Sequence, residues 1–285
     1  MTISIASATN EGTQLLEAAG IYEPRMEAGS LLAHVLGRDR IFIIAHAEEP
    51  LTDEQMALFR GCVGRRAQGE PLQYITGRQE FFKLEFEVTP DVLIPRPETE
   101  IIVETARELL RDEAQPFVAD IGAGSGCIAI SLLNEFPEAR AVATDISPAA
   151  LRVARRNAAR HGVIDRLTWL ESDCFSALQP ARQFRLIASN PPYVSDIELD
   201  AMQREVRYEP RAALFAGPDG LAVIRRLLRD APLFLQRDGY LVFEIGFGQH
   251  EAVKSLIDRD VWKLLEIRED LQHIPRTVVL QNRER

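Results

Sequence analysis

The chain has 285 residues, of which 46% are hydrophobic and 27% charged, and these ordinary globular values exclude a disordered or fibrous protein. Its net charge is −10, from 33 basic against 43 acidic residues, which disfavours a surface built to bind a nucleic-acid backbone. No apolar run approaches the ~18 residues of a membrane-spanning helix, and residues 1–6 do not resemble a signal peptide. We therefore expect a cytoplasmic protein without membrane or nucleic-acid partners; composition does not give the oligomeric state, for which we expect a monomer.

Metal chemistry is not expected from the cysteines and histidines. The three cysteines, Cys62, Cys127 and Cys174, are far apart and form no CxxC motif, so they predict neither a disulfide framework nor a zinc site. The five histidines include no pair at a spacing typical of metal ligands.

The first 80 residues are predicted to form a small acidic helical domain. Residues 52–55 read Thr-Asp-Glu-Gln, a capping box that begins a helix, and the buried stripe of that helix is expected at Met56, Leu58, Phe59 and Cys62. Two earlier helices are expected to end at glycines 20 and 37. The domain over residues 1–80 could either stabilise the rest of the chain or dock a partner.

Residues 81–96 are predicted to form a β-hairpin linker. Apolar and charged residues alternate over 82–88, which is the pattern of a half-buried strand. Pro90 and Asp91 indicate a turn, and residues 92–94 a second short strand. Prolines 95 and 97 end the hairpin, and a helix is expected over residues 98–110.

From residue 117 onward strands and helices alternate, which indicates a mostly parallel sheet covered by helices on both faces. Ligands of such sheets bind beyond the carboxyl ends of the strands. The expected strands cover residues 117–121, 139–144, 167–171, 184–189, 239–245, 262–266 and 277–281, and the expected helices cover residues 128–134, 148–161 and 221–235.

A glycine-rich turn, Gly122-Ala123-Gly124-Ser125-Gly126, directly follows the first of these strands. Glycine lets the backbone turn sharply and approach a ligand closely. The spacing is GxGxG and not the dinucleotide fingerprint GxGxxG, because Cys127 stands where the third glycine would be. A P-loop is also excluded, since no Gly-Lys-Ser/Thr follows.

Two carboxylates accompany the glycine turn. Asp120 would repel a pyrophosphate and suit a cationic ligand, and Asp145 at the end of the next strand can accept hydrogen bonds from ribose hydroxyls. Together with Gly122, Ala123, Gly124, Ser125 and Gly126, they resemble the S-adenosylmethionine site of class I methyltransferases. This resemblance implies S-adenosyl-L-methionine as cofactor, S-adenosyl-L-homocysteine as product, no metal, and an adenine contact at Asp173 and Cys174, although many relatives carry a large aromatic residue in place of Cys174.

Asn190-Pro191-Pro192-Tyr193 follows the fourth strand of this region and resembles the (N/D)PP(Y/F) signature of methyltransferases that modify planar nitrogens. Such a nitrogen belongs either to a glutamine side-chain amide or to an adenine. The side-chain oxygen of Asn190 can accept one N–H of the amide and the carbonyl of Pro191 the other, while the prolines fix the geometry of both acceptors. We expect Tyr193 to lie against the flat amide, so that Asn190, Pro191 and Tyr193 are catalytic and Pro192 helps to bind the substrate.

Five motifs occur along the chain in the order Pro71–Gly77 (PLQYITG), Ile94–Glu100 (IPRPETE), Asn190–Tyr193 (NPPY), Tyr208–Arg211 (YEPR) and Gly217–Gly220 (GPDG). This series resembles the bacterial peptide chain release factor N5-glutamine methyltransferase family. This resemblance implies a class I methyltransferase α/β fold with a doubly wound, seven-stranded mixed sheet over residues 97–285, and a helical domain over residues 1–80 that helps to bind the release factor. It also implies methylation of the glutamine in the Gly-Gly-Gln motif of release factors, with Asn190 also contacting the cofactor. The alternatives are an adenine-N6 DNA or RNA methyltransferase and a non-catalytic binding module with the same fold.

Overall fold

The computed structural model describes residues 3–197 and 203–283. Parts of both predicted domains lie outside the described residues: 1–2 of the domain predicted over 1–80, and 198–202 and 284–285 of the domain predicted over 97–285. The chain divides into two compact units, one of residues 1–78 with 203–208 and one of residues 79–202 with 209–285. In the described ranges, every helix is too short or too polar to cross a membrane.

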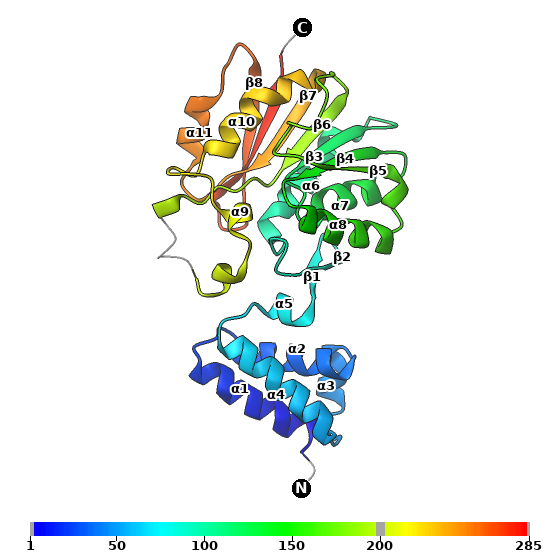
Figure 1. The fold of residues 1–285 in the computed structure, drawn as a ribbon, viewed down its shortest axis with the longest axis vertical. Coiled ribbons are helices and arrows are strands. Elements are labelled where there is room, and N and C mark those ends of the chain that lie inside the picture. The colour runs from blue at the N-terminus through cyan, green and yellow to red at the C-terminus, as the bar shows by residue number, and fades with distance from the viewer. Residues whose placement is uncertain (1–2, 198–202, 284–285) are drawn as a thin grey trace. The chain divides into compact units, whose positions relative to one another are not determined.

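Among the described residues, the N-terminal part of the first unit contains five α-helices (Figure 1). The predicted capping box is confirmed, because the Thr52 hydroxyl accepts a hydrogen bond from the Gln55 backbone and the Gln55 side chain accepts one from the Thr52 backbone. Gly20 and Gly37 follow the first two helices with positive φ, as expected for helix ends. The helices are α1 (Ile5–Ala18), α2 (Pro24–Leu36), α3 (Arg40–Ala45), α4 (Asp53–Ala67) and α5 (Leu72–Thr76).

The core of this unit corrects one sequence-based expectation. Leu58 was expected in the buried stripe of α4, but 56% of its surface is exposed. The stripe runs instead through Met56, Phe59 and Val63, at the i, i+3, i+7 spacing of one helix face, and Leu58 is about 200° around the helix from Met56. Helices α3 and α5 were not predicted, because six and five residues are too few to show a helical period.

A segment far along the chain also belongs to the first unit. Residues 205–208 form a short 3₁₀ helix, and Glu205 accepts a hydrogen bond from the buried Arg66 of α4 at 2.9 Å. Arg66 also forms an ion pair with Glu27 of α2. Tyr208 donates to the carbonyl of Gln68 at 3.3 Å. The guanidinium of Arg66 therefore joins two helices to the segment that follows the NPPY motif in the chain.

The second unit begins with a hairpin of β1 (Arg78–Phe81) and β2 (Leu84–Glu87). Its turn is at Phe82 and Lys83, both with positive φ, and not at Pro90 and Asp91 as predicted. The predicted strand over residues 92–94 is wrong, since these residues are irregular. A turn with two positive φ values normally contains asparagine or glycine, so Phe82 and Lys83 gave no signal.

The main sheet of the second unit has seven strands in the order β5-β4-β3-β6-β7-β9-β8. All neighbouring pairs from β5 to β7 are parallel, whereas β9 is antiparallel to both β7 and β8. The mixed sheet implied by the family resemblance is therefore confirmed. The strands are β3 (Phe117–Ile121), β4 (Arg140–Asp145), β5 (Leu167–Glu171), β6 (Phe184–Ser189), β7 (Leu235–Glu244), β8 (Trp262–Glu269) and β9 (Pro275–Asn282).

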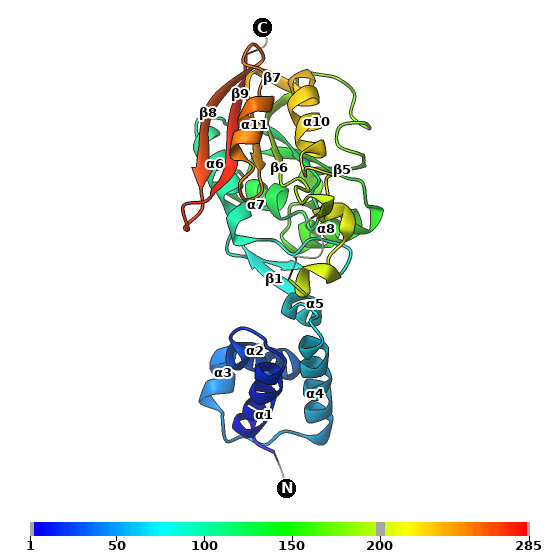
Figure 2. The ribbon, with the colours of Figure 1, turned by 90° about the vertical axis from the view of Figure 1, so that its left-hand side faces the viewer.

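Helices cover both faces of this sheet, as predicted (Figures 1 and 2). Successive residues of β3 enter different cores, with Val118 packed in the cluster that includes α6 and α7 and Ala119 in the cluster that includes α10. The predicted helix over 221–235 is too long, because Pro232 interrupts it and β7 begins at Leu235. The helices are α6 (Glu100–Leu109), α7 (Cys127–Glu135), α8 (Pro148–Arg160), α9 (Arg211–Leu214), α10 (Ala222–Asp230) and α11 (His250–Leu256).

Candidate active site

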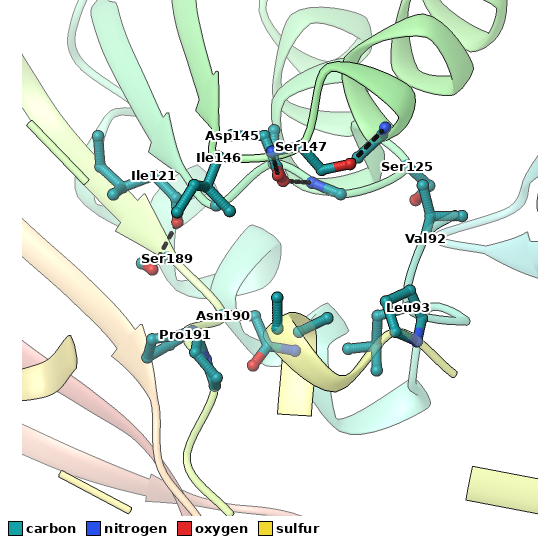
Figure 3. Close-up of a pocket in the computed structure, with 18 of the residues that line it drawn as sticks. Val92, Leu93, Ile121, Ser125, Asp145, Ile146, Ser147, Ser189, Asn190 and Pro191 are labelled. Carbon is teal, nitrogen blue, oxygen red and sulfur yellow. Dashed lines mark hydrogen bonds between the residues drawn. The ribbon is translucent and has the colours of Figure 1, made fainter. Parts of the chain in front are cut away.

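A cavity of about 330 Å³ lies at the carboxyl ends of the parallel strands of the second unit (Figure 3). The glycine loop after β3, Asp145 at the end of β4 and Asn190 after β6 all line it, so the structure brings together motifs that are up to 68 residues apart. The volume is within the range of small-molecule sites, about 300–1,000 Å³.

The glycine loop exposes its backbone to open space. Gly122 and Gly124 have φ values of 80° and 56°, and a Cβ atom at either position would meet no other atom within 4 Å. Gly126 also has a positive φ, but a Cβ atom there would be 3.0 Å from Ile130 and 3.2 Å from Ala154. The first two glycines therefore leave room for a ligand against the backbone, whereas the third permits close packing of the loop on α7 and α8.

Asp145 lines the cavity and also holds the glycine loop in place. Its Oδ2 accepts a hydrogen bond from the Gly124 backbone and its Oδ1 one from the Ser147 backbone, both at 2.8 Å. Burial raises the pKa of this carboxyl, although these backbone hydrogen bonds oppose the shift. A carboxylate has about four lone-pair positions, so Asp145 keeps acceptor capacity for a ligand.

The structure places Asp120 beneath the glycine loop and not on the cavity wall. Only 1% of its surface is exposed, and its Oδ2 accepts a hydrogen bond at 3.0 Å from the Ala129 backbone in the first turn of α7. Burial, with a contribution from the charge of Asp145, raises the pKa of Asp120 to about 7. Asp120 therefore fixes the start of α7 behind the loop, and a direct contact with a ligand is not part of this geometry.

Asp173 and Cys174, which follow β5, line the same cavity. Asp173 accepts a hydrogen bond from the Arg226 side chain at 2.7 Å. Cys174 has a φ of 51°, and burial raises the pKa of its thiol to about 11, so this side chain stays neutral. A small uncharged side chain at this position forms part of the wall where the family resemblance implies an adenine.

The NPPY motif divides between the cavity and the protein interior. Asn190, Pro191 and Pro192 line the cavity, but Tyr193 does not. The Tyr193 hydroxyl donates a hydrogen bond to Glu244 at 3.1 Å, and burial raises the pKa of Tyr193. Its backbone carbonyl accepts a hydrogen bond from the Gln249 side chain at 2.9 Å. The expectation that Tyr193 lies against a substrate amide is therefore not supported, and its contacts anchor the motif instead.

Sequence reasoning missed two residues that contact this motif through hydrogen bonds. The side-chain nitrogen of Asn190 donates to the Thr99 hydroxyl at 2.9 Å, and the Thr99 hydroxyl donates to Glu244 at 2.6 Å. Thr99 lies in the IPRPETE motif, and Glu244 is the last residue of β7. Glu244 could have been predicted from the sequence by the same signal as Asp145, because both are acidic residues at the carboxyl end of a parallel strand.

Two further motifs brace the cavity wall. Glu209 of YEPR is buried, accepts a hydrogen bond from the Ile94 backbone at 3.1 Å and forms an ion pair with Arg96 of IPRPETE. Gly220 of GPDG has a φ of 71°, and a Cβ atom there would be 2.2 Å from the Tyr193 carbonyl oxygen. Only glycine therefore lets the GPDG turn approach the backbone of the NPPY motif so closely.

This fold, with a glycine loop and a strand-end carboxylate around one cavity, defines a class I methyltransferase. The family model described as methyltransferase small domain matches residues 99–217. A solved methyltransferase from Pyrococcus furiosus is 17% identical and has a TM-score of 0.51, with 72% of this chain and 91% of that chain covered. Across the described ranges, no group of three or more His, Cys, Asp and Glu side chains could hold a metal ion.

The particular family follows from closer relatives. The release factor glutamine methyltransferase of Koribacter versatilis is 42% identical over 97% of this chain and 98% of its own length. The one from Geobacter sulfurreducens is 47% identical over 86% of this chain and 84% of its own length. The family model of the PrmC N-terminal domain matches residues 7–77. The chain belongs to the release factor glutamine methyltransferase family.

Proposed function

We propose that this chain transfers a methyl group from S-adenosyl-L-methionine to the side-chain amide nitrogen, N5, of the glutamine in the Gly-Gly-Gln motif of peptide chain release factors. The observation that carries the proposal is that the Asn190–Pro192 segment shares one cavity with the glycine loop and Asp145. A methyl donor and a planar amide could therefore meet in one enclosed site.

The residues of the cavity fit this cofactor. The open backbone at Gly122 and Gly124 accommodates its methionine portion, and the remaining lone pairs of Asp145 accept hydrogen bonds from its ribose hydroxyls. Asp173 and Cys174 form the wall expected to contact the adenine. When bound, the cofactor supplies an activated methyl group on a positively charged sulfur.

The chain's own part in the chemistry is orientation of the nitrogen. An amide nitrogen is a poor nucleophile because its lone pair is delocalised into the carbonyl. The Asn190 side-chain oxygen and the Pro191 carbonyl accept its two N–H groups, and these hydrogen bonds strengthen as the nitrogen gains positive charge. The prolines keep both acceptors in one geometry. The proton leaves to water after transfer, so no general base is required.

The proposal also assigns roles to the rest of the chain. Residues 1–80 form a domain that helps to dock the release factor, residues 81–96 link it to the catalytic domain, and residues 97–285 carry out catalysis. The protein acts in the cytoplasm, as a monomer, on a protein and not on nucleic acid. Support for the release factor as the substrate comes from the match of residues 7–77 to the PrmC N-terminal domain and from the names of the relatives.

A labelling experiment tests the proposed substrate. The purified chain is incubated with S-adenosyl-L-methionine carrying a labelled methyl group and, in parallel, with a release factor, the same factor with its Gly-Gly-Gln glutamine changed to alanine, and double-stranded DNA. We expect label on the intact factor alone. Label on DNA would favour the adenine-N6 alternative, and cofactor binding without transfer to any substrate would favour a binding module.

A further inference from the structure

A buried chain of hydrogen bonds lies behind the Asn190 side chain. Asn190 Nδ2 donates to Thr99 Oγ1 at 2.9 Å, and Thr99 Oγ1 donates to Glu244 Oε2 at 2.6 Å. The other carboxylate oxygen of Glu244 accepts a hydrogen bond from the Tyr193 hydroxyl at 3.1 Å. Both Thr99 and Glu244 are 1% exposed. Of these four residues, Asn190 and Thr99 line the cavity, whereas Glu244 and Tyr193 do not, and the Asn190 carboxamide is shown at the cavity in Figure 3.

Counting protons fixes the direction of these bonds. A threonine hydroxyl has one hydrogen, and Thr99 donates it to Glu244. The same hydroxyl can then only accept a hydrogen bond from Asn190, so Asn190 must turn its NH₂ group toward Thr99. Its oxygen is left to face elsewhere. Without this constraint, the two ends of a carboxamide are nearly equal in size, and either could point into the cavity.

We propose that Thr99 and Glu244 are positioning residues that orient the Asn190 carboxamide so that its oxygen faces the methyl-accepting nitrogen. This inference rests on the proposed function, since an amide or amine substrate presents N–H donors that need an acceptor. An Asn190 turned the other way would place a donor opposite these donors and would repel the substrate. The residues act only through Asn190 and need not touch the substrate.

The direction of the chain depends on an ionised Glu244. Burial raises the pKa of Glu244 to about 7, while hydrogen bonds from Thr99 and Tyr193 and the charge of Arg276 on β9 oppose the shift and the charge of Glu98 adds to it. Below this pKa, a protonated Glu244 can donate to Thr99, and Thr99 can then donate its own hydrogen to Asn190. The whole chain reverses and the Asn190 NH₂ group turns toward the cavity. The turnover number should therefore fall on the acid side.

The first test removes one hydroxyl. Thr99→Val keeps the shape of the side chain but not its hydrogen bonds, and we expect at least a tenfold lower kcat on the release factor with unchanged affinity for S-adenosylhomocysteine. Thr99→Ser should recover most of the rate. Thr105→Val is the matched control, because Thr105 is buried in α6, the helix that begins directly after Thr99, and its hydroxyl has no hydrogen-bond partner in the part of the chain that the structure describes. A wild-type kcat in Thr99→Val would overturn the inference.

The second test follows pH. In the wild type, kcat should rise with increasing pH, and the pKa of this rise should be near that of Glu244. Glu244→Gln should have a lower kcat and should not show this fall of kcat at acid pH, called the acid limb, because the group that titrates is gone. An acid limb of the same pKa in Glu244→Gln would contradict the inference. A loss of packing alone would lower the rate at all pH values and leave the pH profile in place.

The third test needs no activity. In labelled wild-type protein with bound S-adenosylhomocysteine, the side-chain NH₂ protons of Asn190 should show nuclear Overhauser effects to the Thr99 methyl group at pH 8. Absence of these effects at pH 8 would overturn the inference even if every variant failed to fold. If the wild type transfers no methyl group to the release factor, the proposed function fails instead, and this measurement still decides the orientation of Asn190.

Discussion

The two ends of the cavity hold their polar groups in different ways. At the cofactor end, Gly122 and Gly124 offer bare backbone, and the Asp145 carboxylate is held by the backbone N–H groups of Ser147, two residues away, and of Gly124 in the glycine loop. At the reactive end, the Asn190 side chain is held by Thr99, which is 91 residues away in the chain. Thr99 is held in turn by Glu244, which is 145 residues from Thr99. The first end is built by local backbone geometry, and the second by long-range side-chain contacts.

This difference predicts how each end should respond to mutation. Loss of a side chain at the cofactor end should change binding, because the remaining backbone still forms the site. Loss of a side chain at the reactive end should change the rate, because no backbone group replaces an acceptor aimed at the transition state.

The largest effect is expected for Asn190→Ala. It removes one of the two proposed acceptors, and the loss of a comparable hydrogen-bonding group in other active sites lowers kcat by about 10²–10³-fold. The fold should survive, since the carboxamide faces the cavity. Steady-state methylation of a release factor, with circular dichroism to monitor folding, provides the measurement. Methylation at a nearly normal rate would remove Asn190 from the mechanism.

A large effect is also expected for Gly220→Ala, although Gly220 touches no ligand. A Cβ atom 2.2 Å from the Tyr193 carbonyl oxygen must displace the NPPY backbone, and misplacement of a catalytic group by ~1 Å can cost about 10²-fold in rate. Gly248→Ala is the matched control, because its φ of 76° imposes the same backbone strain but a Cβ atom there meets nothing within 4 Å. Equal kcat losses in the two variants would show that strain alone, and not contact with Tyr193, is responsible.

At the cofactor end, Asp145→Ala should weaken binding more than turnover. The variant loses a charged acceptor for the ribose and the two hydrogen bonds to the backbone, so we expect the Kd for S-adenosylhomocysteine to rise about 10–100-fold. Calorimetry measures this directly. Glu171→Ala is the control, because Glu171 is exposed and pairs with Asp145 in the β4–β5 ladder without lining the cavity. Unchanged affinity in Asp145→Ala would rule out the ribose contact.

The smallest effect concerns stability and pH. Burial raises the pKa of Asp120 to about 7, so the folded state binds a proton that the unfolded state has already lost above its ordinary value of 3.8. The contribution of Asp120 to the free energy of unfolding should therefore be largest at low pH and should be lost as pH rises from 3.8 to about 7. In Asp120→Asn the fall of the free energy of unfolding between pH 5 and 8 should be smaller by about 2–3 kcal/mol.

Denaturant unfolding at several pH values measures this slope. Burial also raises the pKa of Glu244 to about 7, so Glu244 should account for part of the pH dependence that remains in Asp120→Asn. Asp112→Asn removes a charge from an exposed side chain of the same unit and should leave the slope as it is in the wild type. A slope in Asp120→Asn equal to that of the wild type would show that Asp120 does not titrate in this range.

The same contrast explains what could be predicted from the sequence. The cofactor end depends on strands and turns that have local signals, and the ranges expected for β3, β5 and β6 agree with the structure residue for residue. The carboxylate Asp145 was found because strand ends are visible in the hydrophobic pattern. Asp120 has the same signal but lies under the loop, because a residue at a strand end can face the interior as well as the cavity.

The reactive end depends on contacts that a sequence pattern does not contain. The motif Asn190–Tyr193 was recognised, but its partners Thr99 and Glu244 come from other strands and helices, and only the folded sheet brings them together. For the same reason Tyr193 was assigned to the substrate when its hydroxyl is bound to Glu244. The hairpin was also misplaced, since the turn at residues 82–83 lacks the residues that normally adopt positive φ.

The most direct test of the whole account is to locate the transferred methyl group. A release factor is incubated with the wild-type chain and S-adenosyl-L-methionine, digested with protease, and its peptides are fragmented in a mass spectrometer. The account predicts one added methyl group on the side-chain nitrogen of the Gly-Gly-Gln glutamine and none in a parallel sample treated with Asn190→Ala for the same short time. A methyl group on any other residue, or equal methylation by the two proteins, would contradict it.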